Sequence, residues 1–380
     1  MQIYSRHNLH ELEWPKHIPA PMRSMLSALV EQGIKRFVAN ASAEVQLLIV
    51  PEGALPLAIV DREPKEASSY VCSPTSHYID YARQEVALEL AQQPLLRRMV
   101  PPILSALRPI FRLSQIERIV YVNNWMLSTN LYPELSRETL MEIKRCLVQR
   151  FPDHTIVFRS LNEGMNAPII DELEALGFLK AFSRQVYLLD PRDGSFRRHN
   201  SYGNDRRLAA KSSYRWRRHA SLGPNESEHL LDLYNQLYLD KYSYYNPQFT
   251  RDFIEQALAG EWLRIAALER DARIDGLLGV IEQHGVITAP LVGYERSVSQ
   301  KEGLYRLLMF DMLCQASERG CLLHLSSGAA KFKRLRGAEA FLEYSLVYNR
   351  HLKPQRRIAW QLLSWLSQRA IIPVMQRYQL

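Results

Sequence analysis

Hydrophobic positions along this chain follow two kinds of pattern. Some are short, nearly continuous apolar runs, such as VQLLIV (45–50) and TIVFRS (155–160), which are typical of buried strands. Others recur every three or four residues over a longer segment, as in 136–151, which is typical of a helix with one apolar face. The two kinds alternate from one end of the chain to the other, so the pattern predicts a mixed α/β protein.

The segment 166–178 (NAPIIDELEALGF) is predicted to be a short helix between two strands. Asn166 is a favourable N-cap, and Gly177 suits the left-handed residue that often ends a helix. A second helical pattern, 95–111, contains Pro101 and Pro102. Because a proline inside a helix removes a hydrogen bond and clashes with the preceding turn, we expect that helix to break there.

The order strand, long helix, strand, short helix, strand occurs twice. In the second half it follows two helices and a three-stranded meander, and its last elements are LLHLSSG (322–328), AAKFKRLRG (329–337) and AFLEYSLVYNR (340–350). The repeat predicts two tandem domains, each with a mixed, mostly antiparallel sheet flanked by helices. The predicted segments are an N-terminal arm (1–25), an N-terminal domain (26–192), a C-terminal domain (193–352) and a basic amphipathic tail (353–380).

Composition agrees with a globular protein of two domains. The chain has 380 residues, of which 47% are hydrophobic and 23% charged. We see no long apolar run, no secretory signal, and no Cys or His spacing typical of metal ligands, so a cytoplasmic protein without a metal is expected. The net charge of +8 favours a polyanionic partner or substrate.

This repeated order resembles the fold of GNAT acyltransferases, and two copies in one chain resemble the FemAB-related group of tandem GNAT-like transferases. The segments that carry the resemblance are 293–313, 324–338 and 158–178. It implies an N-acyltransferase that moves an acyl group from a thioester, either acyl-CoA or an acyl-carrier protein, to a small-molecule amine. The second copy is expected to hold the working site, with the first as a non-catalytic scaffold. An aminoacyl-tRNA-dependent transferase and a non-catalytic binding module remain alternatives.

The resemblance implies donor-binding residues at two places. Gln300 and Gly303 match the loop whose backbone N–H groups bind a pyrophosphate before a long helix, whereas Tyr305 replaces a second glycine. In the strand 286–294, Pro290 cannot donate a hydrogen bond, so a bulge is expected in a central strand. The thioester carbonyl is expected to bind beside that bulge, at Leu291 and Val292.

Catalytic roles are expected on the last elements of the second half. The resemblance puts Lys333 where a side chain acts on the leaving thiolate, and its ammonium could stabilise an oxyanion or hold a substrate anion. The alternative for Lys333 is a solvated basic helix. Tyr344 and Tyr348 are candidate acids, and Glu282 is a candidate base acting through water.

Acceptor binding is expected at the aromatic segment 237–250, where Tyr242, Tyr245 and Asn246 would lie over the cleft, or else pack between the two halves. Ser327 and Gly328 are also expected at the substrate. The basic segment 196–219 suits phosphate groups of coenzyme A, a carrier protein or tRNA, although a solvated linker has the same pattern. The acid-free tail is expected either to dock on the protein or to lie on a membrane surface.

Overall fold

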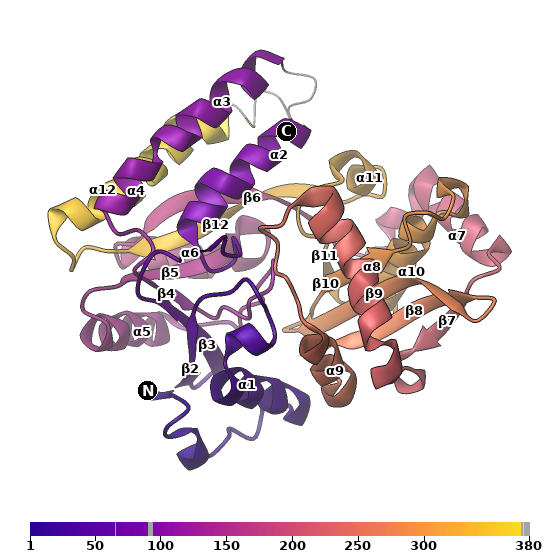
Figure 1. Ribbon diagram of the computed structural model, residues 1–380, viewed down its shortest axis with the longest axis horizontal. Coiled ribbons are helices and arrows are strands. Elements are labelled where there is room, and N and C mark those ends of the chain that lie inside the picture. The colour runs from indigo at the N-terminus through magenta and orange to yellow at the C-terminus, as the bar shows by residue number, and fades with distance from the viewer. Residues whose placement is uncertain (65, 90–93, 374, 376–380) are drawn as a thin grey trace.

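The computed structural model describes residues 1–64, 66–89, 94–373 and 375 of the chain (Figure 1). Its centre is one sheet of twelve strands that runs through both halves of the molecule. The predicted mixed α/β fold is therefore confirmed, with the strands of the two halves joined side by side. In spatial order the strands are β1 (Gln2–Tyr4), β2 (Glu44–Val50), β3 (Gly53–Val60), β4 (Ile119–Val122), β5 (Thr155–Asn162), β12 (Glu339–Tyr348), β6 (Leu179–Leu189), β11 (Leu322–His324), β10 (Val286–Tyr294), β9 (Arg273–Gln283), β8 (Arg264–Arg270) and β7 (Arg215–Arg218).

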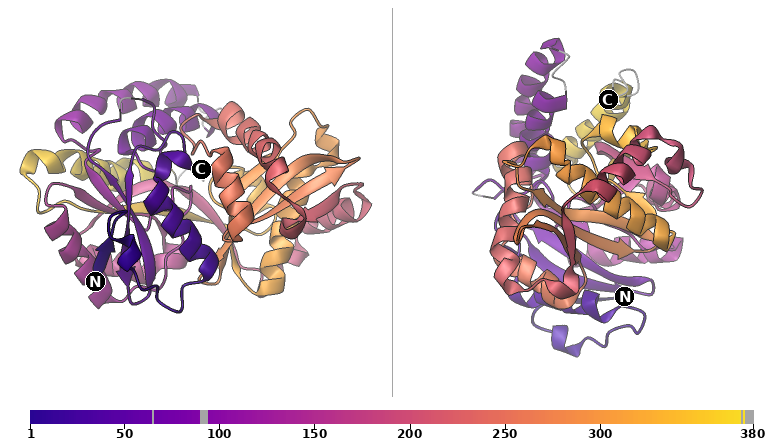
Figure 2. Two further views of the ribbon diagram at one scale, coloured as in Figure 1. Left: turned by 60° about the horizontal axis from the view of Figure 1, so that its bottom comes forward. Right: turned by 90° about the vertical axis from the view of Figure 1, so that its right-hand side faces the viewer.

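Helices cover both faces of this sheet, as the two views in Figure 2 show. One face packs a single apolar core that extends across both halves, under α1 (Ala20–Gln32), α4 (Arg108–Leu113), α8 (Ser227–Asn235), α9 (Arg251–Gly260) and α12 (Pro354–Leu366). The other face has two separate cores. One lies under α5 (Arg137–Arg150) and α6 (Glu163–Ala175), and the other lies under α7 (Asn200–Lys211) and α10 (Leu304–Arg319).

The C-terminal strand β12 lies inside the sheet of the first half. It pairs antiparallel with β5 on one side and with β6 on the other. Strand β6 in turn pairs antiparallel with β11 of the second half. The sheet therefore crosses the predicted domain boundary at residues 192 and 193, and the division of the chain into two domains stays a prediction.

Local predictions of helix ends were correct at some positions and wrong at others. Helix α6 begins at Glu163, three residues before the predicted N-cap, and Asn166 lies inside it at a kink with φ −125°. The buried Asn166 accepts a long hydrogen bond from the backbone N–H of Asn162 at 3.4 Å, across the first turn. At the other end, Gly177 has the predicted positive φ of +89°.

The predicted break at Pro101 and Pro102 is wrong. Helix α3 (Pro94–Ala106) runs through both prolines, and the chain turns only at Leu107, before α4. The two prolines leave the carbonyls of Arg97 and Arg98 without their helical donors. Both arginines are exposed, so water can hydrate these carbonyls and the helix can continue.

Candidate active site

The sheet opens in the second half, where β10 and β11 separate. The two strands are parallel and paired only at Val286–Thr288 and Leu322–His324. On its other side, β10 shifts register against β9 between Thr288 and Leu291, at Pro290. The predicted bulge in a central strand is thus confirmed, and beyond it the backbone of β10 is no longer paired with β11.

A cavity of about 200 Å³ lies at this opening. Met309 and Met312 of α10 line it from one face of the sheet, and Tyr70 and Tyr81 line it from the other. Because its walls come from both faces, we infer that the cavity crosses the sheet between β10 and β11. Such a passage allows two reactants to approach one point from opposite sides.

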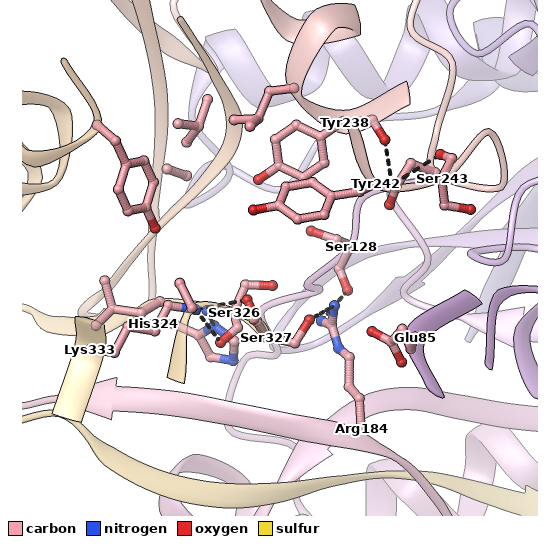
Figure 3. Close-up of a pocket in the computed structure, with 18 of the residues that line it drawn as sticks. Glu85, Ser128, Arg184, Tyr238, Tyr242, Ser243, His324, Ser326, Ser327 and Lys333 are labelled. Atoms are coloured by element: carbon pink, nitrogen blue, oxygen red, sulfur yellow. Dashed lines mark hydrogen bonds between the residues drawn. The ribbon is translucent and has the colours of Figure 1, made fainter. Parts of the chain in front are cut away.

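Tyrosine rings make up much of one wall. Tyr70 stacks on Tyr81 with ring centroids 4.5 Å apart, and burial raises the pKa of Tyr70. Tyr238 and Tyr242, from the π-helical segment η7 (Gln236–Tyr242), lie across the cavity from Ser327 (Figure 3). Glu85 of α2 (Ala82–Glu89) is the one carboxylate among the described residues that line this cavity.

Arg184, which forms a buried ion pair, lines the cavity on the side of the first half. Arg184 on β6 donates from Nε to Glu343 Oε1 at 2.8 Å and from Nη2 to the carbonyl of Ser128 at 2.6 Å. Arg184 is 5% exposed and Glu343 is fully buried. With its charge compensated by Glu343, Arg184 connects β6, β12 and the loop at Ser128, three segments that are distant in sequence.

Lys333 secures the loop that follows β11. Its ammonium donates to the backbone carbonyls of Ser326 at 3.1 Å and Ser327 at 2.7 Å, and it is only 3% exposed. This loop needs such support because Ser326 and Ala329 both have a positive φ, +57° and +50°. The interpretation of Lys333 as part of a solvated basic helix is therefore wrong, whereas Lys331 on the same short helix, α11 (Ala330–Arg334), is exposed.

His324 is a buried polar residue of the cavity that the sequence did not indicate. Its Nδ1 accepts a hydrogen bond from the backbone N–H of Ser326 at 3.1 Å, so Nε2 carries the proton of the neutral ring. Nε2 has no hydrogen-bond partner among the described residues. Burial, together with the charges of Arg184 and Lys333, lowers the pKa of His324 to about 3.

The predicted donor loop lies next to this cavity. Gln300 and Gly303 border a separate hollow at the N-terminus of α10, and Tyr305 borders both hollow and cavity. Gly303 has a φ of +67°, and a Cβ there would lie 2.6 Å from Leu208 on α7. Glycine adopts this φ without strain, and a larger residue here would also require the side chain of Leu208 to shift.

The cavity brings together most of the residues predicted to bind substrate. Tyr242, Asn246, Ser327 and Gly328 line it, as do Val292 and Lys333. The side-chain amide of Asn246 donates hydrogen bonds to the carbonyls of Tyr238 and Ser243, so Asn246 helps to shape the cavity wall. Leu291 belongs to the core under α8 and α9, on the other side of β10.

Besides Gln300, Gly303 and Leu291, four more predicted residues are not among those lining the cavity: Tyr245, Tyr344, Tyr348 and Glu282. Tyr344 belongs to the core under α5 and α6, where burial raises its pKa to about 12. Glu282 lies elsewhere on β9 and bonds Arg264 and Arg319. Burial opposes its ionisation, but these two hydrogen bonds outweigh it and lower the pKa of Glu282. In this structure neither Tyr344 nor Glu282 is positioned to exchange a proton with a molecule in the cavity.

The first half supplies cavity residues that no motif indicated, namely Tyr70, Tyr81, Gln84, Glu85, Ser128 and Arg184. The only local signal is the density of tyrosines between residues 70 and 81.

Among the described residues, no group of three or more His, Cys, Asp or Glu side chains could hold a metal ion. None of the described helices is both long and apolar enough to span a bilayer.

Comparison with known proteins assigns part of the chain. Residues 195–334 match the model of the acetyltransferase (GNAT) domain, whereas no curated protein matches the sequence. Among solved structures, FemX has 9% identity and a TM-score of 0.47 over 65% of this chain and 83% of its own. L-PGS from Bacillus licheniformis has 12% identity and a TM-score of 0.42 over 61% and 78% of the two chains. A GCN5-related N-acetyltransferase from Kribbella flavida has 12% identity and a TM-score of 0.35 over 88% and 97%.

The matched segment contains β10, β11, α10 and the loop held by Lys333, which are the elements that form the opening in the sheet. The GNAT resemblance expected from the sequence is thereby confirmed for residues 195–334, which match the model of the acetyltransferase (GNAT) domain.

Proposed function

We propose that the protein is an N-acyltransferase that uses an acyl thioester. The amine nitrogen of an acceptor attacks the thioester carbonyl, a C–N bond forms, the C–S bond breaks, and the thiol leaves with a proton. The observation that carries this proposal is the cavity that crosses the sheet where β10 leaves β11. It lets donor and acceptor meet from opposite faces, and bringing two reactants together in this way accounts for a large part of enzymatic rate enhancement.

The donor is proposed to enter from the side of α10. Its acyl-bearing arm would lie along β10, at Ala289 and Val292, where the strand has lost its partner. Phosphate groups would bind at the adjacent hollow, which combines the N-terminus of α10 with Lys241 and Arg296. Acyl-CoA and the phosphopantetheine arm of a carrier protein both have this chemistry.

The acceptor is proposed to enter from the opposite side, past the tyrosine wall. Glu85 lines this wall, and the aromatic faces of Tyr70 and Tyr81 suit an amine that arrives as its ammonium cation and loses a proton before its nitrogen attacks the thioester. Lys333 is proposed to act as a positioning residue, since both of its donated bonds hold the carbonyls of the loop at Ser326 and Ser327.

The test measures thiol release from acetyl-CoA and from an acyl-carrier protein, each with a panel of primary amines. Reactions with buffer in place of the protein are the control. Ala289→Trp fills the cavity and should abolish release, whereas Ala340→Trp, at an exposed position on β12, should leave it intact. Transfer from aminoacyl-tRNA alone would replace this proposal with the tRNA-dependent reaction. Failure of every donor to react or bind would leave a non-catalytic binding module.

A further inference from the structure

Large apolar side chains that remain exposed are concentrated on neighbouring helices of the first half and the C-terminus. Six of the eleven among the described residues lie on α3, α4, α12 and the π-helical segment η9 (Ser367–Ile371). Leu113 is 67% exposed and Trp365 is 59% exposed. The six are Met99, Ile103, Leu113, Ile358, Trp365 and Ile371. Such a concentration is uncommon on a soluble surface and marks an interaction site.

These helices also bury a face of their own against the protein. Phe111 on α4 and Trp360 and Leu363 on α12 are buried in the core shared by the two halves. Met99 and Ile103 are four residues apart on α3, and Ile358 and Trp365 are seven apart on α12, so each pair lies on one helix face. Helices α3 and α12 therefore each have an exposed apolar stripe, which on α12 is additional to the apolar face that the helix buries against the protein.

The charge of these segments has one sign. Residues 94–115 and 354–380 contain no Asp or Glu, and each segment has four arginines. Arg108 and Arg112 pair with Asp80 and Glu63 from neighbouring segments. Arg97, Arg98 and Arg369 are exposed beside the apolar stripes.

The two acid-free segments lie together although they are far apart in the sequence. Helix α12 contacts α4, and α3 continues from α4 past the edge of the sheet, at the top of Figure 1. Figure 2 shows the same helices next to each other from a second direction. Exposed apolar residues with flanking arginines on adjacent helices fit the chemistry of an anionic lipid surface. Two copies of this surface would repel each other by charge, which disfavours self-association.

We propose that α3, α4 and α12 form a docking surface for membranes that contain anionic phospholipid. The apolar stripes insert at the level of the headgroups, and the arginines contact lipid phosphates. Helix α2, which supplies Gln84 and Glu85 to the cavity, directly precedes α3 in the chain. The docked protein therefore holds the acceptor wall near the membrane. This proposal does not depend on the chemistry at the cavity.

Co-sedimentation of the full chain with vesicles tests the proposal. Binding is expected to vesicles of phosphatidylcholine mixed with phosphatidylglycerol, to weaken with added salt, and to be at least about tenfold weaker for phosphatidylcholine alone. Ile103→Glu and Trp365→Glu should each weaken binding by about tenfold or more, because each places a charge where an apolar side chain would insert. Met141→Glu, an exposed apolar position on α5 across the sheet, is the matched control and should bind like the wild type.

A second measurement does not depend on the folding of these variants. Vesicles with brominated acyl chains should quench part of the tryptophan fluorescence of the wild type, and Trp365→Phe should lose that part. The proposal is overturned if the wild type does not sediment with anionic vesicles, or if Met141→Glu weakens binding as much as Trp365→Glu. It is also overturned if light scattering finds a dimer that Trp365→Glu dissociates, because a second copy would then cover this surface.

Discussion

Replacing Lys333 by methionine should destabilise the protein although the residue lies in a basic segment. Methionine keeps most of the apolar stem and removes only the ammonium. The change deletes two hydrogen bonds, to the carbonyls of Ser326 and Ser327, at a side chain that is 3% exposed. A hydrogen bond from a charged group is worth about 1.5–3 kcal/mol. Part of the free energy of these two bonds is recovered when water hydrates the freed carbonyls, so we expect a loss of about 3 kcal/mol in the free energy of unfolding.

Urea denaturation followed by circular dichroism measures this loss. Lys331→Met, two residues earlier and exposed, is the control and should stay within about 0.5 kcal/mol of the wild type. If Lys333→Met also stays within about 0.5 kcal/mol, the reasoning is refuted. Should stability be unchanged while kcat/KM falls by about 10²-fold, Lys333 acts directly on the reacting atoms as an oxyanion donor would.

Three further predictions follow from single side chains. His324 has a pKa near 3 when folded and 6.5 when unfolded, so the folded state binds fewer protons between these values and stability falls as pH drops through this range. His324→Gln should remove up to about 1.4 kcal/mol per pH unit of that slope, measured by urea denaturation at several pH values, and an unchanged slope would contradict the assignment. Gly303→Ala should destabilise the fold by about 1–3 kcal/mol and so lower the thermal midpoint, because φ is +67° and the new Cβ meets Leu208. Calorimetry that finds no shift in the midpoint would count against this prediction. Glu343→Gln should lower the free energy of unfolding by about 3–5 kcal/mol, because it leaves the charge of Arg184 buried without its carboxylate. Urea denaturation at neutral pH measures this loss, and a clearly smaller loss would mean that water enters and solvates Arg184.

The order of elements could be predicted because helix and strand periods are local properties of the sequence. The pairing of β12 could not. Its buried residues Leu346 and Val347 belong to opposite faces of the sheet, and an apolar run of this kind does not indicate which strands lie beside it. The continuity of α3 was missed for a similar reason, because the effect of Pro101 and Pro102 depends on whether the freed carbonyls face water.

The site was predictable only where it lies on one short segment. Ser327 and Gly328 lie in the loop after β11, and Val292 lies two residues after Pro290, so the motifs of the second half indicated them. Tyr70 and Arg184 reach the same cavity from elements more than 100 residues apart in sequence, through packing that no local pattern encodes. The burial of Lys333 was hidden because α11 has five residues, too few to display an amphipathic period.

The insertion of β12 between β5 and β6 has a consequence for biosynthesis. When a ribosome has made residues 1–192, β5 still lacks its neighbour β12, and β6 lacks both of its neighbours, β11 and β12, which are encoded at residues 322–324 and 339–348. Until these strands have been made, the nascent chain carries unpaired apolar strand edges on β5 and β6 that can pair with other chains. The N-terminal half therefore completes its fold only after almost the whole polypeptide has left the exit tunnel. Chaperone dependence and aggregation during expression should consequently depend on residues 339–380, and a truncation that removes them should yield insoluble protein.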